Sequence, residues 1–165
     1  MRTVALSLMA VISLSGCVVA VAHRTPVEIA ATSGAADTSA PVFITAPGGA
    51  STLPFSDAVR VGNIIYLSGK LGTDPATGAL VHGGIGPETR QALENIRRTL
   101  EANGSSMDRV FKCSVFLADM KEWPAMNTVY VTFFPNHKPA RSAFGATGLA
   151  LNARTEIECA ATVGI

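Results

Sequence analysis

The chain is organised around the stretch Lys138-Pro139-Ala140-Arg141-Ser142-Ala143-Phe144-Gly145, in which an arginine follows a proline-containing turn and leads into small and aromatic residues. We expect Arg141 to lie buried at the head of a strand. A guanidinium is permanently charged and its fork matches a planar carboxylate, so its burial there makes sense if an anion meets it. The residue type alone leaves two interpretations of about equal weight, a structural salt bridge and a clamp for a carboxylate ligand.

The segments on either side of this stretch have clear periods. Residues 110–120 alternate in a way that predicts a strand with both faces largely buried. Residues 155–163 predict a last strand. Between these two segments a helix is expected over 121–134, ended by Pro135, because apolar residues recur at spacings of three and four. These residues are Trp123, Met126, Tyr130 and Phe133.

The preceding part of the chain predicts three short strands and one longer helix. Residues 42–45, 58–61 and 64–68 are the strands, and Gly62-Asn63 is typical of a two-residue hairpin turn. Pro87 and Glu88 open the helix, and Asn103-Gly104 ends it. Its apolar face consists of Leu93, Ile96 and Leu100, and its solvated face of Arg90, Glu94, Arg97, Arg98 and Glu101. The Gly-rich patch 68–72 lacks a phosphate-loop ending, which favours tight backbone packing there.

This order of elements predicts an α+β domain, one mixed sheet with two helices on one face. Apolar residues on the uncovered face then need a partner, so we expect a homo-oligomer whose sheets pack together.

Composition limits the classes of function. The chain has 165 residues, 48% hydrophobic and 15% charged, which suits one packed domain with an appendage. The net charge is +1 and both signs are interspersed, so no basic stripe for nucleic acid is expected. His23, His82 and His137 share no metal-ligand spacing with the cysteines, which argues against a zinc site.

The N-terminus has the pattern of an export signal. Residues 1–16 predict a signal peptide, and Leu14-Ser15-Gly16-Cys17 resembles a bacterial lipobox in which Cys17 becomes lipidated. Cleavage after Ala22 is the alternative, and it would release a soluble periplasmic or secreted protein. We favour a cell-envelope lipoprotein anchored through Cys17. Residues 17–41 then form a flexible tether, and 42–165 form the folded domain.

A few polar residues stand out in apolar surroundings. Glu156 and Glu158 share one face of the last strand, so one of them is expected to meet Arg141 or a water; an edge strand protected by charge is the alternative. Asn127 lies in the apolar face of the second helix, where its amide contacts a loop or ligand or caps nearby backbone. Ser68 ends a strand without a Ser/His/Asp set to make it a nucleophile.

The cysteines of the folded part are Cys113 and Cys159. Both lie in strands expected to be buried, which favours inert thiols. An oxidising compartment permits a disulfide if the strands bring them close enough.

Several landmarks together point to one family. They are Gly62-Asn63 before the apolar strand to Ser68-Gly69, Asn127 with Tyr130 and Phe133-Phe134, Pro139-Ala140-Arg141-Ser142, and Glu156-Ile157-Glu158. On them, the chain from about Ile44 to the C-terminus resembles the Rid family, the reactive intermediate deaminases also called YjgF-like proteins. Because the landmarks are spread over the whole domain, the resemblance is specific.

The resemblance implies a chorismate-mutase-like fold and a homotrimer with ligand clefts between subunits. It also implies hydrolysis of 2-imino or enamine acids, such as 2-iminobutanoate, to 2-oxo acids and ammonia without a cofactor. Arg141 would hold the substrate carboxylate, and Glu156 would orient the attacking water. Ser68, Gly69 and Asn127 would line the cleft.

Two positions depart from the pattern of well-known imine deaminases. Phe55 stands where they carry a tyrosine, and Ala143 where they often carry a cysteine. The loss of the phenol removes a hydrogen-bonding group from the cleft. The alternative function is therefore a non-catalytic trimer that binds small carboxylates or acts like a chaperone in the cell envelope. An endoribonuclease role, reported for some relatives, is disfavoured because no basic surface is expected.

Overall fold

The computed structural model describes residues 40–45 and 53–164. The expected signal peptide, Cys17 and the tether up to residue 39 lie outside the described residues. Within the described ranges, no helix is both long and apolar enough to cross a membrane.

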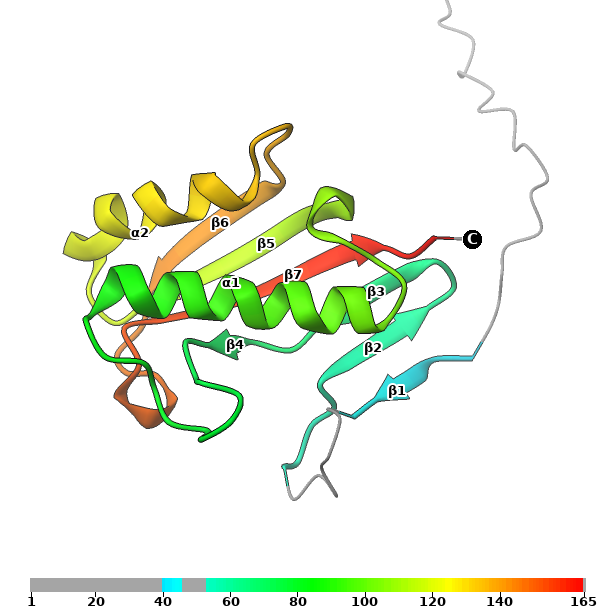
Figure 1. Ribbon diagram of the computed structural model, residues 1–165, viewed down its shortest axis with the longest axis horizontal. Helices are drawn as coiled ribbons and strands as arrows, with labels where there is room; N and C mark the ends of the chain where they lie inside the picture. Colours follow the sequence, from blue (N-terminus) through cyan, green and yellow to red (C-terminus); the bar gives the residue numbers. More distant parts are fainter. Residues whose placement is uncertain (1–39, 46–52, 165) are drawn as a thin grey trace, which may run out of the picture. The chain divides into compact units, whose positions relative to one another are not determined.

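The core of the domain is one seven-stranded mixed sheet (Figure 1). Its order is β1-β2-β3-β7-β5-β6, with β4 also paired to β7. The β5/β6 pair is parallel and the other pairs are antiparallel. The strands are β1 (Val42–Ile44), β2 (Ala58–Val61), β3 (Ile64–Leu67), β4 (Lys70–Leu71), β5 (Val110–Leu117), β6 (Ala140–Gly145) and β7 (Thr155–Thr162).

The central position of β7 answers one open question about its two glutamates. β7 has β5 on one side and both β3 and β4 on the other. It is therefore not an edge strand, and the interpretation of its acids as edge protection is wrong.

The predicted hairpin and first strand are confirmed. β2 and β3 pair antiparallel from Ala58 opposite Leu67 to Val61 opposite Ile64. Gly62 in the turn has φ 58, a left-handed conformation that glycine adopts without steric cost. β1 then pairs with β2.

β4 was not predicted as a strand. After Leu67 the chain leaves β3, passes through Ser68 and Gly69, and pairs again with β7 farther along. The patch is tightly packed, as predicted: a Cβ added to Gly72 would lie 2.6 Å from the Cα of Glu88.

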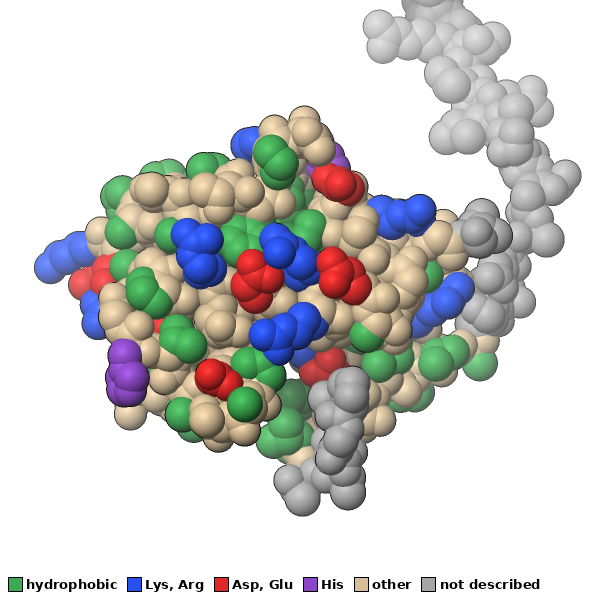
Figure 2. Space-filling view, in the orientation of Figure 1, with side chains coloured by type: hydrophobic (Ala, Val, Ile, Leu, Met, Phe, Trp, Pro, Cys, Tyr) green, Lys and Arg blue, Asp and Glu red, His purple; other side chains and the backbone are tan. Residues whose placement is uncertain are grey.

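Two helices cover one face of the sheet, α1 (Ile85–Ala102) and α2 (Trp123–Tyr130) (Figure 1). The apolar face predicted for α1 is confirmed, since Leu93, Ile96 and Leu100 are all fully buried. Its outer side carries both signs of charge, and Arg97 pairs with Glu94 at 3.0 Å. Figure 2 shows Lys, Arg, Asp and Glu side chains intermixed over this part of the surface.

Glu88 is the predicted acid in the first turn of α1, and it has a further role. It is only 6% exposed, and its Oε2 accepts a hydrogen bond from the backbone N–H of Arg154 at 2.7 Å. Arg154 precedes β7 by one residue. The carboxylate therefore ties the start of α1 to the start of the last strand.

The second helix is shorter than predicted. α2 ends at Tyr130, and single 3-10 turns extend it at both ends, over Met120–Glu122 and Val131–Phe133. Met126, Tyr130 and Phe133 are buried as expected, whereas Trp123 is 41% exposed. Trp123 is the first residue of α2.

The prediction that both faces of the 110–120 strand are buried is wrong for this chain. β5 ends at Leu117, and a register irregularity between Val110 and Lys112 leaves Phe111 exposed. Cys113 and Val115 face the helices and are buried, while the alternate positions are half-exposed on the other face.

This uncovered face of the sheet carries large apolar side chains in contact with solvent. Strand pairing places them on the same side as one another and opposite the helices. They are Phe43, Val61, Tyr66 and Phe144. An apolar face of this kind is consistent with the expected homo-oligomer, which stays a prediction.

Cys113 and Cys159 form a disulfide, so the preference for free thiols is wrong. The two residues are direct partners in the antiparallel β5/β7 pair, with Cα atoms 4.1 Å apart. Closely spaced partners in neighbouring strands bring the two sulfurs together, which the sequence separation of 46 residues did not reveal.

Candidate functional site

Glu156 lies on the uncovered face of the sheet, directly over the break between β3 and β4. It pairs with Phe116 of β5 and with Leu71 of β4, and it is partly buried. A Cβ added to Gly69 would lie 1.9 Å from Oε1 of Glu156. The carboxylate therefore occupies the space that any side chain at position 69 would need.

The surroundings of Glu156 change its acidity. Partial burial raises the pKa of its carboxyl group, and the nearby charge of Glu158 raises this pKa further. A carboxylate with a raised pKa is a better proton acceptor than an exposed one. Glu156 is thus suited to receive a proton from a water molecule.

Ser68 lies beside Gly69, and its hydroxyl is already used within the chain. Its Oγ donates to the carbonyl of Ser56 at 2.7 Å, and its backbone N–H donates to the carbonyl of Asp57 at 3.1 Å. These bonds are consistent with the prediction that Ser68 is not a nucleophile. They also link it to the loop of Phe55, whose ring is 55% exposed.

Arg141 lies in β6, on the face that the helices cover. It pairs with Cys113 of β5, and its Cζ lies 4.5 Å from the centroid of the Tyr130 ring in α2. This is a cation–π contact. Within residues 40–45 and 53–164, Arg141 forms no ion pair with a carboxylate. Ala143 follows on the same face and packs against the core.

Two side-chain oxygens of α2, one of them on the tyrosine that contacts Arg141, are buried without a hydrogen-bond partner among the described residues. They are Oδ1 of Asn127 and Oη of Tyr130; Thr155 of β7 has a third such atom. Burial raises the pKa of Tyr130 to about 12, although the charge of Arg141 acts in the opposite direction. The phenol therefore stays neutral at physiological pH and can donate a hydrogen bond. Buried polar atoms without a partner are uncommon, and they indicate a place where a ligand or a second chain completes the contacts.

The predicted site residues thus form two groups. Ser68, Gly69 and Glu156 lie together, which we call the glutamate group. Arg141 and Ala143 lie on the helix side, where Arg141 contacts Tyr130, and Asn127 lies about one turn before Tyr130 in α2; we call these four residues the arginine group. The two groups are on opposite faces of the sheet, because the β5 partners of Arg141 and Glu156 are three residues apart.

The expectation that a glutamate of the last strand meets Arg141 is therefore wrong within one chain. The alternation of side chains along β5 separates them. Sequence reasoning also missed Tyr130 as a neighbour of Arg141, since its helical spacing indicated only a core position. Sequence reasoning also missed the ion pair between Asp57 and Lys70, the residue after Gly69. An acid and a lysine that each stand next to a short apolar strand could have suggested this pair.

Within the described ranges there is no group of three or more His, Cys, Asp or Glu side chains that could hold a metal ion. The chemistry that these two groups offer is binding of an anion by Arg141 and activation of a water by Glu156.

Comparison with known proteins identifies the relatives of this chain. Residues 44–163 match the family model described as "Endoribonuclease L-PSP". The chain is 41% identical over 123 residues to "2-iminobutanoate/2-iminopropanoate deaminase" of Mus musculus, covering 74% of this chain and 91% of that protein. The corresponding deaminase of Capra hircus is 43% identical, with 74% and 90% covered.

Solved structures agree with this match. The crystal structure of YEO7_yeast is 36% identical and superimposes with a TM-score of 0.70, covering 76% of this chain and all of that one. The α+β fold predicted from the resemblance is thereby confirmed.

Proposed function

Because the chain belongs to the Rid family, whose model carries the description endoribonuclease L-PSP, we propose that it hydrolyses reactive 2-imino or enamine acids to 2-oxo acids and ammonia. The observation that carries this proposal is Arg141. Its guanidinium rests on the Tyr130 ring and forms no ion pair among the described residues. Of the two interpretations of this arginine, the unpaired charge favours the clamp for a ligand carboxylate.

In this proposal, Arg141 binds the carboxylate group of the substrate. The fork of a guanidinium gives two parallel N–H donors to one carboxylate, which fixes both position and orientation. The Tyr130 ring supports the guanidinium from one side, with Cζ 4.5 Å from the ring centroid. The buried oxygens of Tyr130 and of Asn127, about one turn earlier in α2, offer further contacts to the polar end of the substrate.

Glu156 orients the water that attacks the imine carbon. The water oxygen bonds to that carbon as Glu156 accepts its proton, and the proton then passes to the nitrogen. The new hydroxyl group then loses its proton to the nitrogen as the C–N bond breaks, which releases ammonia and leaves the 2-oxo acid, so one water is consumed for each imine. An imine carbon is already electrophilic, and a fixed orientation with a placed water is the main requirement.

The complete site is a cleft between two subunits. One chain holds the arginine group and the glutamate group on opposite faces of its sheet, so a single substrate cannot touch both within that chain. A homotrimer with the uncovered sheet faces turned inward would bring the glutamate group of one subunit toward the arginine group of the next. The exposed Phe43, Tyr66 and Phe144 support such an interface.

The protein acts outside the cytoplasm in this proposal, as a lipoprotein anchored through Cys17. The Cys113–Cys159 disulfide supports export, because such bonds persist in oxidising compartments. Mass spectrometry of the mature N-terminus tests the anchor: a diacylglyceryl Cys17 is expected, and a free amine on His23 would contradict it.

The imine-hydrolysis assay tests the activity. A dehydratase generates 2-iminobutanoate in the presence of semicarbazide, and faster 2-oxobutanoate formation with less semicarbazone is expected when the protein is added. Arg141→Ala should abolish the acceleration, and wild-type activity in that variant would refute the role of Arg141. If small 2-oxo acids bind but no rate effect is seen, the protein is a non-catalytic binding module.

A further inference from the structure

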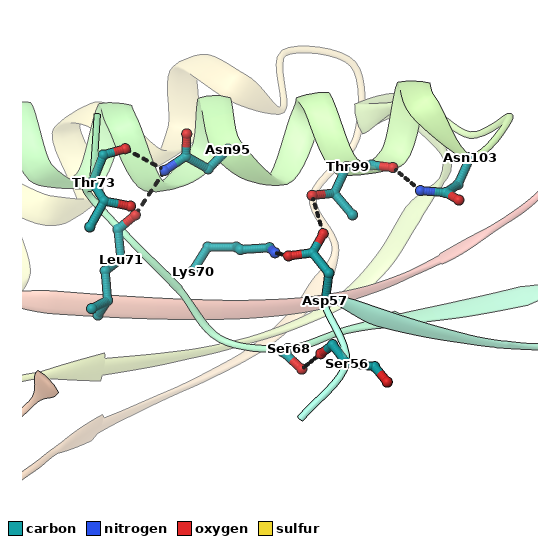
Figure 3. A network of polar contacts seen from close by, with 9 residues as sticks. All are labelled: Ser56, Asp57, Ser68, Lys70, Leu71, Thr73, Asn95, Thr99 and Asn103. Carbon is teal, nitrogen blue, oxygen red and sulfur yellow. Dashed lines mark hydrogen bonds and ion pairs between the residues drawn. The ribbon is translucent and has the colours of Figure 1, made fainter. Parts of the chain in front are cut away.

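The break between β3 and β4 places Gly69 under the Glu156 carboxylate, and polar contacts hold both sides of this break. On one side, the backbone N–H of Ser68 donates to the carbonyl of Asp57 at 3.1 Å. On the other side, Nζ of Lys70 donates to Oδ1 of Asp57. Asp57 therefore holds the residue before Gly69 and the residue after it. Figure 3 shows its contact with Lys70.

Asp57 is itself held from two directions. Its backbone N–H donates to the carbonyl of Ile44 in β1 at 2.8 Å, and its Oδ2 accepts from Oγ1 of Thr99 in α1 at 3.1 Å. The carboxylate thus connects α1 to the strand break. We call Asp57, Lys70 and Thr99 the anchor cluster.

A second contact from α1 supports the same segment. The side-chain amide of Asn95 donates to the carbonyls of Leu71 at 3.0 Å and Thr73 at 2.9 Å, just after the break (Figure 3). The segment that follows Gly69 is therefore fixed to the helix as well as to β7.

The anchor cluster is shielded from water. The side chains of Lys70 and Asp57 are only 13% and 19% exposed. Lys70 pairs with Ile157 of β7, which points to the helices, so its ammonium lies on the side opposite Glu156. The pair cannot touch a substrate bound at Glu156, and any effect on turnover has to pass through the position of Gly69.

We propose that the anchor cluster is a positioning device that presses the Gly69 backbone against Glu156 and so sets the rate of the water-attack step. This inference rests on the proposed imine hydrolysis for its effect on rate, although its geometric part stands on the contacts alone. The ordinary alternative is an ion pair that stabilises the fold without any influence on the site.

The test compares neutral replacements in the full mature protein. Removal of one charge alone leaves the other buried without a partner and can unfold the chain, so the decisive variant is the double change Asp57→Asn with Lys70→Met. The matched control is Glu94→Gln, which removes the carboxylate of the half-buried Arg97–Glu94 pair on α1.

We expect the double variant to lower kcat for the imine about tenfold with KM nearly unchanged, because small displacements of a catalytic group reduce turnover. KM is spared because Arg141 lies in β6, which β7 and β5 separate from β4, and because its contact with Tyr130 comes from α2 and not from α1. Thr99→Val, which removes one contact to Asp57, should lower kcat by a smaller factor, and Glu94→Gln should leave kcat unchanged. An unchanged kcat in the double variant would overturn the inference.

A second readout does not depend on activity. The carboxyl of Glu156 is titrated by ¹³C NMR, with Glu156→Gln to assign its signal. Among the described strands, the ionisable groups on the same face are Glu158 of β7, Lys112 of β5 and Tyr66 of β3, and none of them belongs to the anchor cluster. If the Gly69 backbone moves away from Glu156 in the double variant, water reaches the carboxyl group and its pKa should fall toward the ordinary value of a glutamate. In Glu94→Gln the pKa of Glu156 should not change.

The two readouts separate the two proposals. If the wild-type protein shows no imine hydrolysis but the pKa of Glu156 falls in the double variant, the proposed function fails and the positioning role stands. If the pKa does not move, the anchor cluster is a structural ion pair and the inference is wrong.

Discussion

Gly69→Ala tests how closely the glutamate group is packed. A Cβ at this position would lie 1.9 Å from Oε1 of Glu156, 2.7 Å from its Cδ and 2.9 Å from its Cγ. An ordinary contact starts at 3.4 Å, so the carboxylate oxygen has to move by about 1.5 Å, the difference 3.4 − 1.9. The three nearest atoms all belong to the Glu156 side chain, which can rotate away.

The expected effect is therefore large on catalysis and small on stability. A displacement of about 1 Å can reduce turnover roughly 100-fold, and the shift here is larger. Rotation of a partly exposed side chain costs only about 1 kcal/mol, since no backbone has to move. We expect kcat for 2-iminobutanoate to fall at least about 100-fold with little change in the free energy of unfolding.

The measurement is the imine-hydrolysis rate together with a denaturant titration. Gly148→Ala is the matched control, because nothing lies within 4 Å of a Cβ built there. It should leave both quantities unchanged. If Gly69→Ala retains a kcat within threefold of the wild type, or if it loses rate only because it unfolds, the packing argument is refuted.

Three further predictions concern the arginine group, the disulfide and pH. Arg141→Lys keeps the charge but loses the fork and the stacking on Tyr130, so kcat/KM should fall at least about tenfold through a higher KM; an unchanged KM in steady-state kinetics would contradict the clamp. Replacement of Cys113 and Cys159 by serine opens a loop of 46 residues, and the free energy of unfolding in denaturant titrations should fall by about 4 kcal/mol; equal stability would show that the bond does not form in solution. Glu156 must be ionised to accept a proton, and its pKa is raised. The hydrolysis rate should therefore fall as the pH drops through a value above the pKa of an exposed glutamate. A rate that stays constant down to the ordinary pKa of glutamate would refute this.

The same raised pKa has a consequence for stability. A carboxyl group whose pKa is higher in the folded than in the unfolded chain favours folding when it is protonated. The contribution of Glu156 is therefore present below the unfolded pKa and is lost as the pH rises through the folded pKa. This pH dependence of stability is opposite to that of a carboxylate held by a salt bridge, whose contribution is lost as the pH falls.

Local patterns were enough to predict the elements that depend on neighbours in the chain. The hairpin at Gly62-Asn63 and the buried stripe of α1 follow from turn chemistry and helical period, and both are confirmed. The family landmarks pointed to the right fold. The end of α2 and the exposure of Trp123 were missed, because packing against the sheet decides where that helix stays regular.

Contacts between residues far apart in the chain could not be predicted from local patterns. The sequence by itself determined that Arg141 and Glu156 are unusual in apolar strands, and it identified Ser68 and Gly69 as part of a Gly-rich patch with tight backbone packing. Only the tertiary structure decided that Cys113 faces Cys159, that Arg141 rests on Tyr130, and that the arginine and glutamate groups lie on opposite faces of the sheet. The physical reason is strand register: a shift of one residue turns every side chain to the other face, and the pairing that sets the register joins segments far apart in the chain.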